Sequence, residues 1–193
     1  MTTATGLDLS LTSTGVAAIE ADAITTGRIE SQAPVTPRHP RTGKPLPPTL
    51  RQRDQRLWDL AKAIIAATTG HLPDLVVIEQ PAFSRNIGSS HDRSGLWWLV
   101  VRTLHGIGIP VAEITPTQRA KYATGNGGAG KDAVLLAVAR RYPQVEISGN
   151  DEADALVLAA MGARWLGSPI DDLPKTHLAA FDSVVWPVRE EVR

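Results

Sequence analysis

The chain has 193 residues, which is enough for one domain with a sizeable core and marginal for two. Hydrophobic residues make up 42% and charged residues 21%, so the composition is that of a globular protein rather than a disordered or fibrous one. The chain has no cysteine, which excludes disulfides, a thiolate nucleophile, cysteine-bound zinc and iron–sulfur clusters.

The formal net charge is zero, but the charges are unevenly distributed. Residues 28–62 carry eight basic and three acidic side chains, whereas residues 144–193 carry four basic and nine acidic ones. A basic segment and an acidic cluster in one chain are found in proteins that act on nucleic acid, although solvated helix faces give the same pattern.

The sequence predicts neither an export signal nor a membrane span. Residues 1–5 carry no basic group, and Asp8 interrupts the apolar run that a signal peptide would need. The longest uninterrupted apolar stretch, around residues 96–101, is far too short to cross a bilayer. We therefore expect a cytoplasmic protein that does not contact a membrane.

Three short β-rich segments open the chain. Residues 3–11 and 15–19 flank the turn residues Thr12–Gly15, and a third run follows at residues 23–31. Three successive strands with tight connections predict an antiparallel meander. Residues 34–48 then hold six of the fourteen prolines, which predicts an extended loop inserted into the domain.

The middle of the chain alternates helices and strands. The apolar spacing after Leu50 predicts a helix with Thr49 as its N-cap, and Asp74–Glu79 has the pattern of a buried parallel strand. Residues 93–105 predict a second helix, and residues 109–114 predict a further strand.

Three more helices complete the predicted order. A short one begins at Thr115–Pro116, a second follows the glycine-rich residues 125–130, and the last runs from Asn150 to about Leu166. The prediction is an α/β domain over residues 1–167. Its mixed five-stranded sheet, a three-strand antiparallel meander plus two parallel strands, is flanked by helices. Residues 168–193 are left as a C-terminal tail of unknown role.

Acidic residues occur at three places where packing alone would not put them. Asp8 lies inside the first strand, Glu79 ends the most apolar strand, and Asp151 and Asp154 stand at the start of the last helix. The i,i+3 spacing puts the last two carboxylates on one helix face, which continues as a core stripe. Carboxylates on such a stripe are costly unless they are paired or bind a cation.

Each acid also has an ordinary explanation. Asp8 can hydrogen-bond its own turn, Glu79 can be a strand-end charge, and Asp151 can complement the helix dipole. The predicted order of elements, however, brings the first and fourth strands together, so the four carboxylates predict one site. Such hard oxygen ligands suit Mg²⁺, with Mn²⁺ able to substitute. Two such ions roughly 3.5–4 Å apart promote phosphodiester hydrolysis.

Four sequence blocks carry a resemblance to a known family. In chain order they are Gly6-Leu7-Asp8-Leu9-Ser10 with Thr14-Gly15, then Val77-Ile78-Glu79-Gln80, then Lys121 with Gly125–Lys131, and last Asp151-Glu152-Ala153-Asp154-Ala155-Leu156. Over residues 3–166 these blocks resemble RuvC-type Holliday-junction resolvases, which belong to the RNase H-like nuclease superfamily.

The resemblance implies an RNase H-like fold, a homodimer and Mg²⁺-dependent paired nicks at four-way DNA junctions that leave 5′-phosphate ends. This is an activity of DNA recombination and repair. The resemblance further implies that the four acids bind two metal ions and act in catalysis together with Lys121 and Lys131. The residues implied in DNA contact are Phe83, Arg85, Arg119, Lys121 and Lys131.

The chain departs from the family pattern in three places. Phe83 stands about one position from the aromatic residue that follows Glu-Gln in cellular resolvases. The proline-rich loop at residues 34–48 and the tail after Leu166 look like additions. The preferred branched DNA and any preferred cleavage sequence therefore stay open.

The helix at residues 93–105 is the predicted homodimer interface. Residues 96–101 are apolar on every face, so both sides of this helix should be covered. Trp97 and Trp98 lie about 100° apart on a helix, so at least one should face away from its own core. A two-fold partner would bury that residue; a loop or the C-terminal tail could also do so.

Three other functions remain open on the sequence. Gly125–Lys131 matches the G-x-x-x-x-G-K skeleton of a phosphate-binding loop, but Asp132 stands where a serine or threonine is needed. A sugar-kinase-like ATPase also begins with an acidic hairpin, but Leu9 replaces the glycine that lets phosphate approach. A non-catalytic DNA-binding module of the same fold would not need all four acids.

Overall fold

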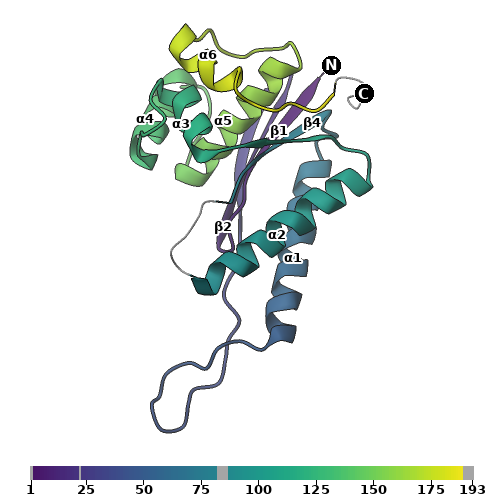
Figure 1. Ribbon diagram of the computed structural model, residues 1–193, viewed down its shortest axis with the longest axis vertical. Coiled ribbons are helices and arrows are strands. Elements are labelled where there is room, and N and C mark those ends of the chain that lie inside the picture. Colours follow the sequence, from purple (N-terminus) through teal and green to yellow (C-terminus); the bar gives the residue numbers. More distant parts are fainter. Residues whose placement is uncertain (1, 22, 82–86, 189–193) are drawn as a thin grey trace.

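A computed structural model describes residues 2–21, 23–81 and 87–188, with side chains from residue 90 onward in the last range (Figure 1). One five-stranded sheet, in the order β3-β2-β1-β4-β5, organises the fold. Its strands are β1 (Thr3–Asp8), β2 (Ser13–Glu20), β3 (Ala23–Glu30), β4 (Leu75–Glu79) and β5 (Val111–Ile114). The first three form the predicted antiparallel meander, and β4 pairs in parallel with both β1 and β5. The predicted mixed sheet is confirmed.

Helices cover both faces of the sheet (Figure 1). They are α1 (Leu50–Thr69), α2 (Ile87–Gly106), α3 (Pro116–Thr124), α4 (Lys131–Arg141), α5 (Asn150–Trp165) and α6 (Lys175–Phe181). The first two pack together on one face, and α3 to α6 lie on the other. Within the described residues, no helix combines the length and the apolar character that a membrane crossing requires.

Local signals fix where several helices begin. Thr49 caps α1 and Thr115 caps α3, each in a reciprocal capping box with a glutamine three residues later. Helix α2 begins six residues before the predicted Arg93. Arg53 of α1 binds the carboxylate of Asp92, and this ion pair docks the early turns of α2 onto α1. This tertiary contact outweighs the weak helix propensity of Gly88-Ser89-Ser90, so the helix starts before them.

The core has two halves, one on each side of the sheet. Side chains alternate along β1, so Leu7 packs toward α1 and α2 whereas Ala4 packs toward α5. In β4, Val77 likewise faces α5. The same alternation sends Asp8 and Glu79, the last residues of their strands, toward the α5 face.

Two glycines let α5 lie directly on the backbone of the sheet. A β-carbon at Gly6 would come within 2.1 Å of the carbonyl oxygen of Ala155, and one at Gly15 within 1.9 Å of that of Asp151. Any side chain at either position would push the helix away. Gly15 pairs with Asp8 across β1 and β2, so the start of α5 is held beside the end of β1.

The segment after residue 167, left unplaced by the sequence, packs against the domain. Asp171 accepts hydrogen bonds from Tyr122 of α3 (3.2 Å), Tyr142 (2.6 Å) and Arg164 of α5 (2.6 Å). Trp186 stacks on Trp165, with ring centroids 5.8 Å apart. The described part of this segment therefore completes the α3–α6 layer, while the domain boundary at 167 stays a prediction.

Candidate active site

The ends of β1 and β4 bring Asp8 and Glu79 together. Leu7 and Ile78 are partners in the parallel register of these strands, so the next residue of each strand lies alongside the other. Helix α5 begins over the same edge and carries Asp151 and Asp154. The charges of Glu79 and Asp154 lie close enough to Asp8 to raise the pKa of its carboxyl group.

A cavity of about 290 Å³ opens at this edge of the sheet. It is lined by Asp8, Leu9, Ser10, Glu79, Gln80, Pro81, Arg93, Trp97, Lys131 and Asp151. Three of the four predicted acids thus reach one cavity, and Asp154 lies beneath it with a side chain 1% exposed. A second cavity, lined by Thr69, Leu72, Pro73, Asp74 and residues 107–110, lies at the opposite end of β4 and contains none of the four.

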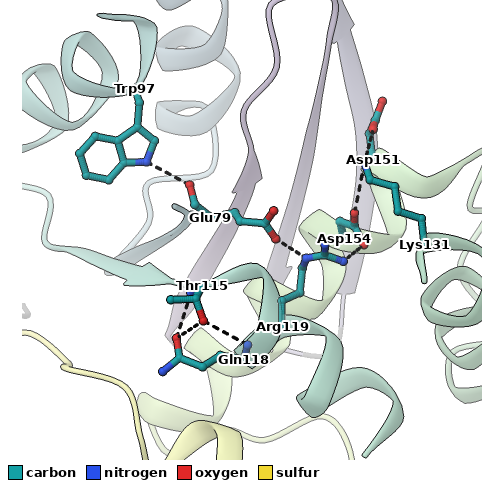
Figure 2. A network of polar contacts seen from close by, with 8 residues as sticks. All are labelled: Glu79, Trp97, Thr115, Gln118, Arg119, Lys131, Asp151 and Asp154. Atoms are coloured by element: carbon teal, nitrogen blue, oxygen red, sulfur yellow. Dashed lines mark hydrogen bonds and ion pairs between the residues drawn. The ribbon is translucent and has the colours of Figure 1, made fainter. Parts of the chain in front are cut away.

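Arg119 lies between two of the acids (Figure 2). Its Nε donates to the carboxylate of Glu79 and its Nη1 donates to Asp154. The Arg119 residue is only 5% exposed, so its guanidinium is a fixed positive charge inside the cluster. Its predicted role in DNA contact stays a prediction; in this structure it binds carboxylates.

Helix α3 can direct only one of its two central basic residues to the acids. Arg119 and Lys121 are two positions apart, which corresponds to about 200° around a helix. The capping box at Thr115 and Gln118 anchors the start of α3 and aims Arg119 at the sheet edge (Figure 2). The side chain of Lys121 therefore starts from another side of α3, where its β-carbon lies beside Gly127. The sequence placed both residues near DNA, but it could not determine the rotation of α3.

Burial and mutual repulsion raise the pKa values of two acids. The pKa of Asp8 rises to about 7, first because the group is buried and then because Glu79 and Asp154 repel its charge. The pKa of Asp154 rises to about 6, mainly through burial, with Arg119 as the largest opposing influence. Ionisation of these two carboxyl groups therefore costs free energy in the folded protein, and a bound cation would reduce that cost.

Lys131 supplies a second positive charge. Its Nζ lies 3.8 Å from Oδ2 of Asp154 and 3.9 Å from Oδ1 of Asp151, as Figure 2 shows. The side chain is 59% exposed, so it can reach a bound anion as well as the acids. It stands at the first position of α4, with Gly130 as the N-cap.

A further contact of the site was not found from the sequence. Trp97 Nε1 donates to the carbonyl oxygen of Glu79 at 3.0 Å and so fixes the end of β4 against α2. Trp97 is 8% exposed and Trp98 is 64% exposed, which confirms that one of the pair faces away from the core. A tryptophan inside an apolar helix gives no sequence signal for such a bond.

The donor set fits hard divalent cations. Oδ2 of Asp154 is buried without a hydrogen-bond partner, and Asp8 is half-buried beside other carboxylates. Both arrangements are costly without a cation. Within the described ranges, no three acidic or histidine side chains already form a metal-binding group. Arg119 lies between Glu79 and Asp154 and pairs with both.

Two of the predicted DNA contacts, Phe83 and Arg85, lie outside the described residues.

The phosphate-loop alternative conflicts with the fold, because Gly125–Lys131 joins helix α3 to helix α4. A phosphate-binding loop of that kind follows a strand. No known family model matches the chain.

Comparison with known proteins gives one consistent result. The chain is 30% identical over 165 residues to the crossover junction endodeoxyribonuclease RuvC of Corynebacterium diphtheriae, covering 80% of this chain and 89% of the relative. It is 30% identical over 105 residues to RuvC of Zymomonas mobilis, covering 54% of this chain and 63% of that relative.

Solved structures agree on the fold. RuvC of Thermus thermophilus in complex with a Holliday junction substrate superposes with a TM-score of 0.62 and 16% identity, over 87% of this chain and 98% of that one. A yeast mitochondrial Holliday junction resolvase gives a TM-score of 0.55 and 10% identity, over 86% of this chain and 79% of that one.

The sheet order and the likeness to the solved structures define an RNase H-like fold. Within that fold class the relatives are specific, and the Corynebacterium match extends over most of both chains. The chain belongs to the RuvC family of crossover junction endodeoxyribonucleases.

Proposed function

We propose that the protein is a divalent-metal-dependent endonuclease that nicks four-way DNA junctions in recombination and repair. The observation that carries the proposal is the convergence of Asp8, Glu79, Asp151 and Asp154 at one edge of the sheet, beside a cavity that Lys131 also lines. Family membership selects branched DNA as the substrate class. We further propose that the protein acts in the cytoplasm, where it would meet this DNA.

The four acids would hold two Mg²⁺ ions, and Mn²⁺ would substitute. Bound there, the ions supply an activated water and charge stabilisation for in-line attack on a phosphodiester, which leaves a 5′-phosphate. Asp8 carries a central charge of the site, since it is coupled to Glu79, Asp154, Lys131 and Arg119. A bound cation would offset its raised pKa and keep it an anion at neutral pH.

Lys131 would act on the scissile phosphate. An exposed ammonium at the start of a helix, next to the acids, is suited to neutralise the charge that grows on that phosphate. Lys121 was predicted to share this role. The rotation of α3 favours Arg119 as the second cation at the acids.

The active form would be a homodimer through α2. Trp98 exposes 64% of its surface on that helix, a large apolar side chain that a two-fold partner would cover. A dimer of this kind would present two active sites to a junction of matching symmetry.

A nicking assay tests the function directly. Synthetic four-way junctions, Y-forks and linear duplexes of matched sequence are incubated with the protein in Mg²⁺, in Mn²⁺ and in EDTA. We expect paired nicks in the four-way junction only with the metals, and little cutting of the linear duplex. Metal-independent binding without nicking would instead identify a non-catalytic DNA-binding module, and ATP hydrolysis would identify an ATPase.

A further inference from the structure

The proline-rich segment forms a small hairpin at residues 37–46, which we call the basic hairpin. His39 N donates to the carbonyl of Lys44 (2.8 Å) and Leu46 N to that of Pro37 (2.9 Å), with a β-bridge between Arg38 and Pro45. Gly43 closes the turn with a φ of 66°, a conformation that favours glycine. The segment that the sequence predicted as a loop therefore has a defined shape.

The basic hairpin is stiff as well as ordered. The imidazole Nδ1 of His39 accepts from the backbone N–H of Arg41 (3.2 Å) and of Thr42 (3.3 Å), which braces the turn from inside. The prolines at 37, 40 and 45, with 47 and 48 behind them, fix the backbone φ angle. A preorganised segment of this kind loses little conformational entropy when it binds a partner.

The hairpin presents positive charge without compensation. Arg38, Arg41 and Lys44 are exposed, and no acidic residue occurs between Glu30 and Asp54. Because the segment has few large apolar side chains, such a surface fits a polyanion better than an apolar protein surface.

The base of the segment is joined to the turn that follows Asp8. Ser31 N donates to the carbonyl of Thr12 (2.9 Å), and Arg56 of α1 donates to both the carbonyl of Leu11 and Oγ of Ser31. The residues just before them in that turn, Leu9 and Ser10, line the active-site cavity. Figure 1 shows the segment leaving the sheet at this edge and extending away beyond the start of α1.

We propose that the basic hairpin binds the phosphate backbone of a duplex arm of the DNA, several base pairs from the cleavage point. The proposal rests on the proposed function, since it needs DNA at the active site. The ten residues from Ser31 to the turn span at most about 33 Å, which corresponds to roughly ten base pairs at 3.4 Å per pair. The hairpin would thus act as a guide for one arm of the branched substrate.

A proline-recognition domain is the main competing partner. The segment contains prolines three residues apart at 34 and 37, at 37 and 40, and at 45 and 48, the spacing that such domains bind in an extended polyproline helix. Between Pro37 and Leu46, however, the backbone is paired in a hairpin. That pairing is incompatible with a polyproline helix and favours DNA.

The test compares two variants of equal charge change. In the hairpin variant, Arg41→Gln and Lys44→Gln are combined; in the control, Arg140→Gln and Lys175→Gln remove two exposed cations from the other helical layer. Affinities for four-way junctions with arms of about 6 and about 20 base pairs are measured in EDTA at several salt concentrations. We expect the hairpin variant to bind the long-arm junction about tenfold more weakly, with a salt slope lower by about 2.

The hairpin variant should bind the short-arm junction as tightly as the parent protein does. The control variant should bind both junctions as tightly as the parent. A second measurement uses the lack of cysteine: a photo-crosslinker on Thr42→Cys should react with the long arm, away from the branch point. Unchanged affinity and salt slope, or a crosslink only at the branch, would overturn the proposal. Because neither measurement requires cleavage, both decide on the hairpin even if the nicking assay fails, so the two proposals fail separately.

Discussion

Arg119 Nε donates to the carboxylate of Glu79, and the same guanidinium reaches Asp154 through Nη1. A residue from the short helix α3 thereby joins the end of β4 to the start of α5. Both acids are predicted metal ligands, so the protein carries its own cation at the place where a metal ion would bind. Arg119 and a metal ion would satisfy the same two carboxylates.

Arg119→Gln should destabilise the metal-free protein. Removal of one partner from a buried ion pair leaves uncompensated charge, and we expect the free energy of unfolding to fall by about 3 kcal/mol in EDTA. Saturating Mn²⁺ should recover much of this loss, because the metal neutralises the same carboxylates. Urea unfolding with and without Mn²⁺ measures both effects. Equal stability of variant and parent in EDTA would contradict the role of Arg119.

Asp8→Asn should abolish nicking and leave DNA binding intact. The change removes a charge that couples to two other acids and to both cations of the site, so single-turnover cleavage of a four-way junction should fall by several orders of magnitude. Junction affinity in EDTA should stay near the parental value. The corresponding amides at Glu79, Asp151 and Asp154 should behave alike, and nicking near the parental rate in the Asp8 variant would refute the site.

The raised pKa of Asp8 predicts a pH dependence of stability in EDTA. Between pH 4 and pH 7 the folded state retains a proton on Asp8 that the unfolded state has released, so this group destabilises the fold as pH rises. Asp8→Asn lacks this effect. The difference in unfolding free energy, variant minus parent, should therefore increase by about 1.4 kcal/mol per pH unit over that range. A flat difference in urea titrations would show that Asp8 has an ordinary pKa.

Lys131→Ala should lower single-turnover cleavage by about 10²–10³-fold, which is the effect of removing one electrostatic stabiliser. Junction binding should weaken only slightly, since one phosphate contact among many is lost. Lys121→Ala is the matched comparison. If Lys121 acts in the site, as the family resemblance implies, Lys121→Ala should lower cleavage as much as Lys131→Ala does. The rotation of α3 instead predicts a much smaller fall in cleavage. Unchanged cleavage in both variants would remove the two lysines from the site.

Trp98→Glu should convert the predicted homodimer into a monomer, because a charge would then occupy the centre of an apolar interface. Light scattering at micromolar concentration measures the mass. Leu136→Glu, at a half-exposed position on α4, serves as the control and should not change it. A parent protein that is already monomeric would contradict the interface.

Much of the fold could be predicted because its signals are local. The meander, the Thr49 and Thr115 caps and the buried strand ending at Glu79 each depend on residues that are close in sequence. The parallel pairing of β1 with β4 then followed from the order of elements. The four acids could be found for the same reason, since each stands at the end of a recognisable element.

The contacts that were missed all depend on the relative placement of distant elements. Arg119 reaches the acids because of the rotation of α3, and Trp97 bonds to Glu79 because of where α2 packs. Helix α6 has only seven residues, and Asp171, just before it, binds Tyr122, Tyr142 and Arg164 from elsewhere in the chain. No periodicity within α6 could indicate such a network.

The direct backbone contact of α5 with Gly6 and Gly15 limits how far this helix can shift on the sheet. A helix that rests on side chains can shift as those side chains change rotamer, whereas backbone against backbone has no rotamer to change. The separation of Asp151 and Asp154 from Asp8 is therefore set by a stiff joint. Since a misplacement of 1 Å can cost a hundredfold in rate, two residues without side chains hold the carboxylates at a separation that thermal motion changes little.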